Sequence, residues 1–349
     1  MPVLGRVATA ERRANQPHHH ERPDLSVQKR VSHVQVAWRC PADVTPGRRI
    51  PRQGLQYDAR VSDTDEAQAA HDQASALIDE RQFVAAVDPA AQACRLRPAW
   101  KKAWWNYAVA LKHAGRWAEC LEACERAIAL DPASSDGMHW NAGIAATALG
   151  DWSRARAAWT AFGISVPPGD GPPEMDIGAA GVRVSLDDHP EVIYGKRLDP
   201  CRVQVATVPL PESKHRFGDI VLHDGEPRGT RTLGDGQIDV FDELVLLKPS
   251  PYGTWRVRAR CHTPEERDEL VARFDDVDGA IEDWTESVHY LCAQCSLGQP
   301  HEHHDTAKDD GWSTERELGL ALRNERDLAR LRTLGLWWRR DVRDVTRVL

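Results

Sequence analysis

The sequence predicts an α+β multidomain fold, in which about three helical hairpins precede a β-rich, α+β C-terminal domain. Three observations carry this prediction. Apolar residues recur at a spacing of 34 to 35 between positions 67 and 166, prolines and glycines interrupt the chain at 167–178, and apolar residues then alternate with a period of two. A chain of 349 residues can form about two or three domains, each with its own core.

The bulk composition is ordinary for a globular protein, with 41% hydrophobic and 28% charged residues. No window approaches the ~18 consecutive apolar residues of a membrane helix, and the N-terminus lacks the apolar core of a secretory signal. The 8 cysteines are too scattered for a disulfide scaffold. We therefore expect no membrane association and a reducing, cytoplasmic environment.

Charge is unevenly distributed along the chain. Residues 1–60 hold eleven Lys and Arg against five Asp and Glu, a net charge of +6. Because the whole chain has a net charge of -8, the remaining residues have a net charge of -14. Residues 1–62 show no sustained apolar period, and we expect a disordered basic segment there. The acidic body matches nucleic-acid phosphates poorly, which disfavours nucleic-acid binding.

The helical region, residues 63–166, is defined by its repeat. Phe83, Trp117 and Trp152 recur at intervals of 34 and 35, as do Ala74, Ala108 and Gly143, while Pro98 and Pro132 close successive units. Small residues let the two helices of a hairpin approach closely, and large ones fill the gaps between hairpins. One hairpin cannot bury its apolar face alone, so about three must stack.

The middle unit resembles the tetratricopeptide repeat family. The resemblance rests on Ala103-Trp104, Asn106-Tyr107-Ala108, Leu111, Gly115, Trp117, Cys120, Ala127 and Asp131-Pro132. It covers roughly 100 of the 349 residues when the looser flanking units are included. It implies that the first helix of each hairpin lines a concave groove that binds a peptide or protein.

In the family's register, the groove would be lined by Trp105, Asn106, Val109, His113, Trp140 and Ile144. Tryptophan is a favoured anchor in interfaces, which suggests a partner with an apolar or aromatic side chain. The alternative is that Trp105 and Trp140 pack inside the stack or against the C-terminal domain. Asn106 matches one member of the family's clamp for a C-terminal carboxylate, but His71, Ser75 and Gly137 depart from the others.

The C-terminal domain, residues 179–349, follows the linker at 167–178. Its first part contains alternating runs that predict a β-sheet or a partly closed barrel: Val182–Leu186, Cys201–Val208, Asp219–Leu222 and Val240–Leu247. The blocks Pro209–Ser213 and Gly218–Gly225 resemble uncharacterised bacterial repeat proteins, and no chemistry follows from them.

Two later segments resemble each other, each with an alternating run that leads into a helix. The runs are Trp255–Arg260 and Glu317–Arg323, and the helices have Thr263 and Asn324 as N-caps. A duplicated strand–helix unit of this kind predicts a ferredoxin-like sandwich. The alternative is one long amphipathic helix from Thr314.

A cluster of cysteines and histidines indicates a zinc site. Cys292 and Cys295 form a Cys-x-x-Cys turn, which is followed by His301, His303 and His304. Two thiolates with two imidazoles complete a tetrahedral zinc shell, so we predict structural zinc on Cys292, Cys295, His301 and His304, with His303 as the alternative ligand. A solvated His-rich loop with two buried thiols is the competing interpretation.

These observations support three functional hypotheses. The first is a non-enzymatic adaptor or scaffold that binds a peptide or protein through the groove, because the sequence contains no phosphate-binding loop and no nucleophile elbow. The second is a metal-dependent enzyme with its site at the Cys292 to His304 cluster, where the repeats would recruit substrate. The third is nucleic-acid binding by the β-rich unit. The sequence does not identify the partner or the oligomeric state.

Overall fold

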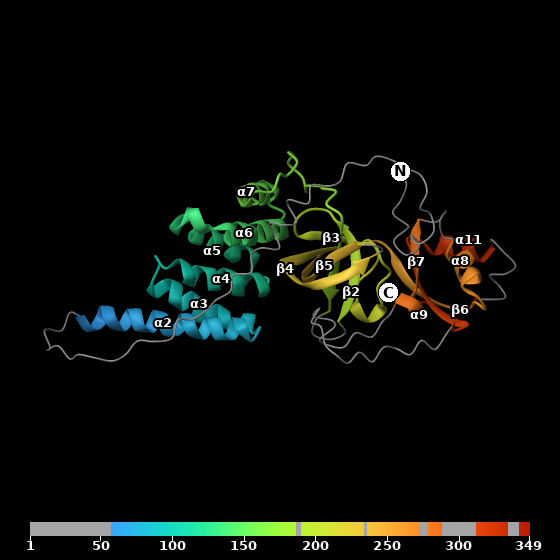
Figure 1. The fold of residues 1–349 in the computed structure, drawn as a ribbon, viewed down its shortest axis with the longest axis horizontal. Helices are drawn as coiled ribbons and strands as arrows, with labels where there is room; N and C mark the ends of the chain where they lie inside the picture. Colours follow the sequence, from blue (N-terminus) through green and yellow to red (C-terminus); the bar gives the residue numbers. More distant parts are fainter. Residues whose placement is uncertain (1–56, 186–189, 234–235, 273–277, 288–311, 334–341) are drawn as a thin grey trace. The chain divides into compact units, whose positions relative to one another are not determined.

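The computed structural model describes residues 57–185, 190–233, 236–272, 278–287, 312–333 and 342–349 (Figure 1). The chain divides into two compact units between Val166 and Pro167. No helix or strand lies between Phe162 and Ala179, where the Pro/Gly linker was expected. Among the described residues, no helix has the length and apolar character needed to cross a membrane.

Three helical hairpins make up the described part of the first unit, coloured blue to green in Figure 1. Their helices are α2 (Tyr57–Asp79) with α3 (Phe83–Leu96), α4 (Lys101–His113) with α5 (Trp117–Leu130), and α6 (Asp136–Leu149) with α7 (Trp152–Phe162). The predicted hairpins are confirmed, with one correction to the expected boundary. Helix α2 already begins at Tyr57, within the segment 1–62 that we expected to be disordered.

Small residues set the spacing between the helices, as the repeat predicted. Ala74 and Ala108 are completely buried. A Cβ on Gly143 would lie 2.6 Å from the Trp159 ring, so α6 and α7 can pack at this distance only because residue 143 lacks a side chain. Gly115 and Gly150, both with φ of 70°, make the turns inside the second and third hairpins.

The second unit begins with a closed barrel of five strands. They are β1 (Ala179–Val184), β2 (Glu191–Arg197), β3 (Arg202–Val205), β4 (Ile220–Leu233) and β5 (Gly236–Lys248). Neighbouring strands pair antiparallel, and β1 closes the barrel by parallel pairing with β5. Strand β2 was missed in the sequence because its alternation is interrupted by Gly195 and by charged residues.

Valines and other apolar side chains fill the barrel, but the barrel also buries charged groups. Asp242, which is 1% exposed, accepts hydrogen bonds from Arg183 Nε at 2.7 Å and from Arg228 Nε at 2.9 Å. Asp199, which is fully buried, accepts one from Arg202 Nε at 2.6 Å. Buried charges are tolerated only when they are paired and hydrogen-bonded, and both Asp242 and Asp199 meet this condition.

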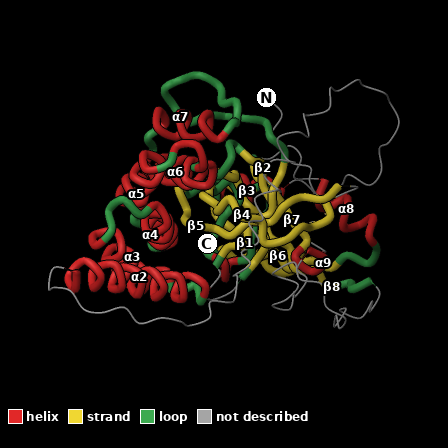
Figure 2. The backbone as a smooth tube through the Cα atoms, turned by 60° about the vertical axis from the view of Figure 1, so that its left-hand side comes forward, coloured by secondary structure: helices red, strands yellow, loops and turns green. Residues whose placement is uncertain are grey.

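A four-stranded antiparallel sheet follows the barrel, in the order β7-β8-β6-β9. Its elements are β6 (Gly253–Arg260), α8 (Pro264–Ala272), β7 (Gly279–Asp283), the short helix α9 (Trp284–Ser287), β8 (Glu315–Leu322), α11 (Glu325–Thr333) and β9 (Val342–Arg347). The duplicated strand–helix pattern is therefore present. Figure 2 labels strands β6, β7 and β8 and helix α8 of this part, and Figure 1 labels α11. The alternative of a long helix from Thr314 is wrong, because residues 315–322 pair with both β6 and β7.

Helices α8 and α11 contribute leucines to the core beside this sheet. Leu270 and Leu328 are buried in one cluster with Val257, Leu318 and Leu320. Helix α8 begins as predicted, since Thr263 Oγ1 accepts a hydrogen bond from the Glu266 backbone N at 3.3 Å. Asn324 differs from Thr263: its backbone carbonyl accepts the hydrogen bond from Asp327 N.

Candidate functional site

The first helices of the three hairpins form one continuous layer. Helix α2 contacts α4, and α4 contacts α6, although each pair is separated by the second helix of a hairpin. Helices that approach across a repeat lie on the inner side of a curved stack. We call the surface formed by α2, α4 and α6 the first-helix face.

Between α2 and α4, this face is joined by a polar cluster. Asn106 Nδ2 donates to Ser75 Oγ at 2.7 Å and lies 3.2 Å from His71 Nδ1. Burial is the largest effect on His71 and lowers the pKa of its imidazole, so the ring is neutral at physiological pH. Three positions that the sequence placed at or near the clamp are thus brought together, but they bond to one another.

Between α4 and α6, an aromatic contact and a buried lysine make the connection. The Trp105 ring lies over Gly137, where a Cβ would approach it to 2.4 Å. Trp105 nevertheless remains 38% exposed. Lys112, which is 6% exposed, donates from Nζ to Asn141 Oδ1 at 3.2 Å. Trp105 is therefore a large apolar side chain that α4 presents to solvent.

The other predicted groove residues have different surroundings. Val109 is half-buried. His113 stacks on Phe83 of α3, with ring centroids 3.9 Å apart. Trp140 makes edge contacts with Trp159 and Phe162 of α7, at centroid distances of 5.1 and 4.9 Å.

Ile144 is completely buried and so presents no surface to a partner. Trp140, with its rings packed on α7, matches the alternative interpretation, in which this tryptophan packs inside the stack. Trp105 differs from both because its ring retains exposed surface. Among the predicted groove residues, Trp105 has exposed apolar surface, and Asn106 has a polar amide group at the α2–α4 contact.

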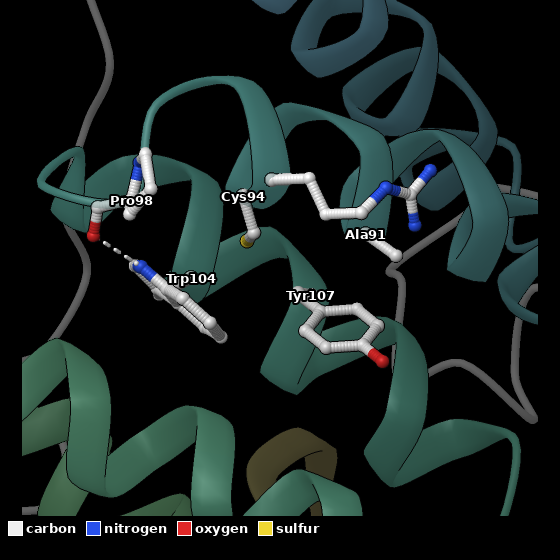
Figure 3. Close-up of a pocket in the computed structure, with 6 residues that line it drawn as sticks. Ala91, Cys94, Pro98, Trp104 and Tyr107 are labelled. Carbon is white, nitrogen blue, oxygen red and sulfur yellow. Dashed lines mark hydrogen bonds between the residues drawn. The ribbon is translucent and has the colours of Figure 1, made fainter.

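A recess of about 370 Å³ lies elsewhere in the helical unit, between α3 and α4 (Figure 3). It is lined by Ala91, Cys94, Arg95, Pro98, Trp104 and Tyr107. Trp104 Nε1 donates to the Pro98 carbonyl at 2.9 Å, which fixes the indole at one wall. Burial raises the pKa of the Cys94 thiol to about 12, so this cysteine is protonated and unreactive at neutral pH. Trp104 is one of the residues on which the resemblance to the tetratricopeptide repeat rests, and the sequence did not place it at a pocket.

In the second unit, two carboxylates hold the loop between β3 and β4. Glu191 accepts from Leu210 N at 3.1 Å, and Glu282 of β7 accepts from Val208 N at 2.7 Å. Burial raises the pKa of Glu191 to about 7. Trp284 Nε1 also donates to the Val208 carbonyl at 2.7 Å. These contacts attach the barrel to the four-stranded sheet.

His215 lies within this loop, between two acidic side chains. Its Nε2 lies 3.1 Å from Glu243 Oε2, and its Nδ1 lies 3.6 Å from Asp219 Oδ2. Burial lowers the pKa of His215, but the interactions with Asp219 and Glu243 outweigh it and raise the pKa to about 9. The imidazole is therefore protonated at neutral pH. Neither His215 nor Glu191 was singled out from the sequence; Glu243 is 28 positions from His215, and Leu210 is 19 positions from Glu191.

The predicted zinc ligands Cys292, Cys295, His301, His303 and His304 lie outside the described residues. Within the described part of the chain, no group of three or more His, Cys, Asp and Glu side chains is placed to hold a metal ion. The described cysteines, Cys94, Cys120, Cys124, Cys201 and Cys261, are all buried free thiols.

Comparison with known proteins identifies the helical segment. Residues 101–134 match the model of the tetratricopeptide repeat. No curated protein sequence matches the chain.

Solved structures resemble the helical part at low overall scores. One is the second tetratricopeptide repeat domain of Spaghetti (RPAP3) bound to the HSP90 peptide SRMEEVD, with a TM-score of 0.28, 20% identity, and coverage of 30% of this chain and 95% of that one. A MamA RS-1 ArsTM double mutant has a TM-score of 0.26 and 20% identity, and the match covers 28% of this chain and 53% of the MamA chain. MamA from Desulfovibrio magneticus RS-1 has a TM-score of 0.24 and 19% identity, and the match covers 27% of this chain and 51% of the MamA chain. The matched segment thus spans about half of these MamA chains.

The match at residues 101–134 covers helices α4 and α5 and the turn that follows them. The hairpins on either side pack against this unit as successive repeats do. The chain therefore carries a repeat of the tetratricopeptide family, at the hairpin that presents Trp105 and Asn106.

Proposed function

We propose that this chain is a non-enzymatic adaptor that holds a peptide or protein partner on the first-helix face. The observation that carries the proposal is the half-exposed ring of Trp105, which lies at the middle helix of the three and over Gly137 of the next hairpin. Burying an exposed tryptophan against a partner is among the most favourable single contacts in protein interfaces. The repeat at residues 101–134 supports the same role.

The flanking groups favour binding over a reaction. Asn106, His71 and Ser75 bond to one another, and Lys112 bonds to Asn141. Side chains held in this way can orient a ligand, but none of them is activated as a nucleophile or a general base. His71 is neutral and adds no charge. The free thiols of the described residues also support our proposal of a reducing, cytoplasmic location.

The test selects ligands directly on the full chain. A displayed library of random twelve-residue peptides would be selected on the immobilised protein, and each enriched peptide would be measured against three forms of the chain. We expect wild type and Val84→Ala to bind equally, because Val84 is an exposed apolar residue of α3 outside the face. Trp105→Ala should bind at least about tenfold more weakly.

Circular dichroism and thermal unfolding would show that both variants stay folded, and Trp105→Phe would retain an aromatic ring over Gly137. Selection of no peptide, or equal binding by Trp105→Ala and wild type, would refute a role of the first-helix face. Trp140 is unsuitable for this test, since its contacts with Trp159 and Phe162 belong to the α6–α7 packing.

We infer separately that the four-stranded sheet with α8 and α11 is a ferredoxin-like unit. The strand order β7-β8-β6-β9, the antiparallel pairing of each neighbouring pair, and a helix after β6 and after β8 support this assignment. Nuclear Overhauser contacts between the methyl groups of Leu270 and Leu320 are expected if the helices cover one face. Their absence in a folded sample would contradict the assignment.

We also propose that Cys292, Cys295 and two of His301, His303 and His304 bind structural zinc. The support is the residue types and their spacing. The purified chain should contain about one zinc ion per molecule, measured by elemental mass spectrometry. The double variant Cys292→Ser/Cys295→Ser should lose it, while Cys94→Ala should keep it. A metal content that is negligible in the wild type would rule the site out.

A further inference from the structure

Asn106 is held in one orientation by its own amide nitrogen. That nitrogen carries two hydrogens, and two acceptors stand within reach: Ser75 Oγ at 2.7 Å and His71 Nδ1 at 3.2 Å. Both donors of the amide are therefore engaged between α4 and α2. The Asn106 carbonyl oxygen has no partner among the described residues, so it is the group left to bind a ligand.

The state of His71 follows from the same bonds. A lowered pKa keeps the ring neutral, with burial as the main cause. Because Nδ1 accepts from Asn106, the ring hydrogen must be on Nε2, where it can donate. The Ser75 hydroxyl accepts from Asn106, so its own hydrogen is also available. The α2–α4 cluster therefore offers one acceptor and two donors, all uncharged.

The cationic groups of α4 are used within the helical unit. Lys101 Nζ pairs with Asp131 Oδ2 at 3.0 Å, and Lys112 Nζ bonds to Asn141 Oδ1 at 3.2 Å. Lys102 is exposed, and its charge contributes to the lowered pKa of His71. A carboxylate that reached this cluster would meet one solvated ammonium at its edge, and the Asn106 carbonyl oxygen would repel it. Such an exposed ion pair contributes little to binding.

An acceptor beside a donor is the complement of an amide group, which supplies one N–H and one C=O. We propose that the first-helix face binds the interior of an extended peptide segment, whose amide groups pair with Asn106 Oδ1 and with His71 Nε2 or Ser75 Oγ. The neighbouring apolar side chain of the segment lies against Trp105. A free C-terminal carboxylate is not the recognised group. This inference rests on the proposed peptide-binding function and specifies its ligand.

Two matched probes test the inference on the full chain. Both are synthetic libraries with the same randomised ten-residue core, one ending in a free carboxylate and the other in a carboxamide. Peptides retained by the protein would be identified by mass spectrometry, remade in both forms, and measured by fluorescence anisotropy. We expect each pair to bind within twofold of one another, with less than a twofold change between 50 and 500 mM salt.

Variants would then locate the contact. Asn106→Leu keeps the size of the side chain and removes the carbonyl acceptor, so binding of both forms should fall at least tenfold. Gln82→Leu makes the same kind of change at an exposed amide in the α2–α3 turn, and it should bind like wild type. Hydrogen exchange over α2 and α4 would confirm that Asn106→Leu keeps these helices folded.

The possible results distinguish failure of this inference from failure of the proposed peptide-binding function. If selected peptides bind only with a free carboxylate, or if Asn106→Leu binds them normally while Trp105→Ala does not, the amide-recognition inference is overturned and the peptide-binding function stands. If neither library contains a peptide whose binding depends on Trp105, both are overturned.

Discussion

The two units of this chain bury different kinds of side chain. In the helical unit the core consists largely of alanines and other small apolar residues, and each hairpin packs against the next one in the sequence. In the second unit Asp199 and Asp242 are buried as charges, and Asp242 pairs with Arg183, which is 59 positions away. The helical unit therefore depends on shape at short sequence distance, whereas the second unit depends on electrostatic pairing at long distance.

We expect the largest effect from a substitution that removes the charge of Asp242. Asp242→Asn keeps the shape of the side chain but removes the buried negative charge that the Arg183 and Arg228 guanidinium groups both contact; Arg228 retains its pair with Glu226 at 3.3 Å. We expect a loss of about 3–5 kcal/mol from the second unit. Hydrogen exchange in increasing urea, read separately for peptides from 179–248 and from 83–162, would measure it.

Asp131→Asn is the matched control in the helical unit. Asp131 pairs with Lys101 at 3.0 Å but is 46% exposed, so its loss should cost at most about 1 kcal/mol. An equal effect of the two substitutions would show that the proposed difference between the units is wrong.

A pH titration should separate the units in a second way. The folded pKa of Glu191, about 7, is above its unfolded value near 4.5, so its stabilising contribution is complete below about pH 4.5 and is lost as pH rises through 7. The folded pKa of His215, about 9, is above 6.5, so its contribution is lost as pH rises through 9. Both shifts predict that the second unit weakens between pH 6 and pH 9.

For Glu191 alone the loss approaches about 3 kcal/mol, from a shift of about 2.5 units at 1.36 kcal/mol each. Chemical unfolding at pH 4.5, 6, 7.5 and 9 would measure it, because part of the Glu191 loss occurs below pH 6. Glu191→Gln should flatten the lower part of this dependence, and the helical unit should change little over the same range. A second unit that becomes more stable from pH 6 to pH 9 would contradict both assignments.

Shape should dominate in the helical unit. Gly143→Ala adds a Cβ 2.6 Å from the Trp159 ring, and the resulting displacement should cost about 1–3 kcal/mol despite the better helix propensity of alanine. Gly171→Ala is the control, because a Cβ there meets nothing within 4 Å. Thermal unfolding of the two variants would show a lowered midpoint for Gly143→Ala alone. Equal midpoints would mean that Trp159 moves without penalty.

The smallest effect tests the regularity of the repeat. Arg81 has φ of 60°, in the turn where the second and third hairpins have Gly115 and Gly150. A left-handed conformation is strained for residues with a Cβ, so Arg81→Gly should stabilise the first hairpin by about 1 kcal/mol. Amide exchange of α2 and α3 would detect this as increased protection. Decreased protection would indicate that the Arg81 guanidinium, 5.8 Å from the Phe83 ring centroid, contributes more than the turn strain costs.

Sequence by itself determined the hairpins, because their information is local. The recurrence of Phe83, Trp117 and Trp152, together with small residues such as Gly143, is enough to specify where helices meet and turn. The alternation of Trp255–Arg260 likewise predicted β6, and Thr263 predicted the start of α8. Each of these features is visible either in residues close together in the chain or in their recurrence at a fixed spacing.

Only the tertiary structure decided which of the groove residues keep exposed surface. Trp105 and Trp140 occupy equivalent positions in the repeat, yet Trp140 packs on Trp159 and Phe162 while Trp105 lies half-exposed over Gly137. The pairing of Asn106 with His71, 35 positions away, was equally hidden. Burial and hydrogen bonding are fixed by neighbours that folding brings together, and a periodic pattern records the position of a residue but not what covers it.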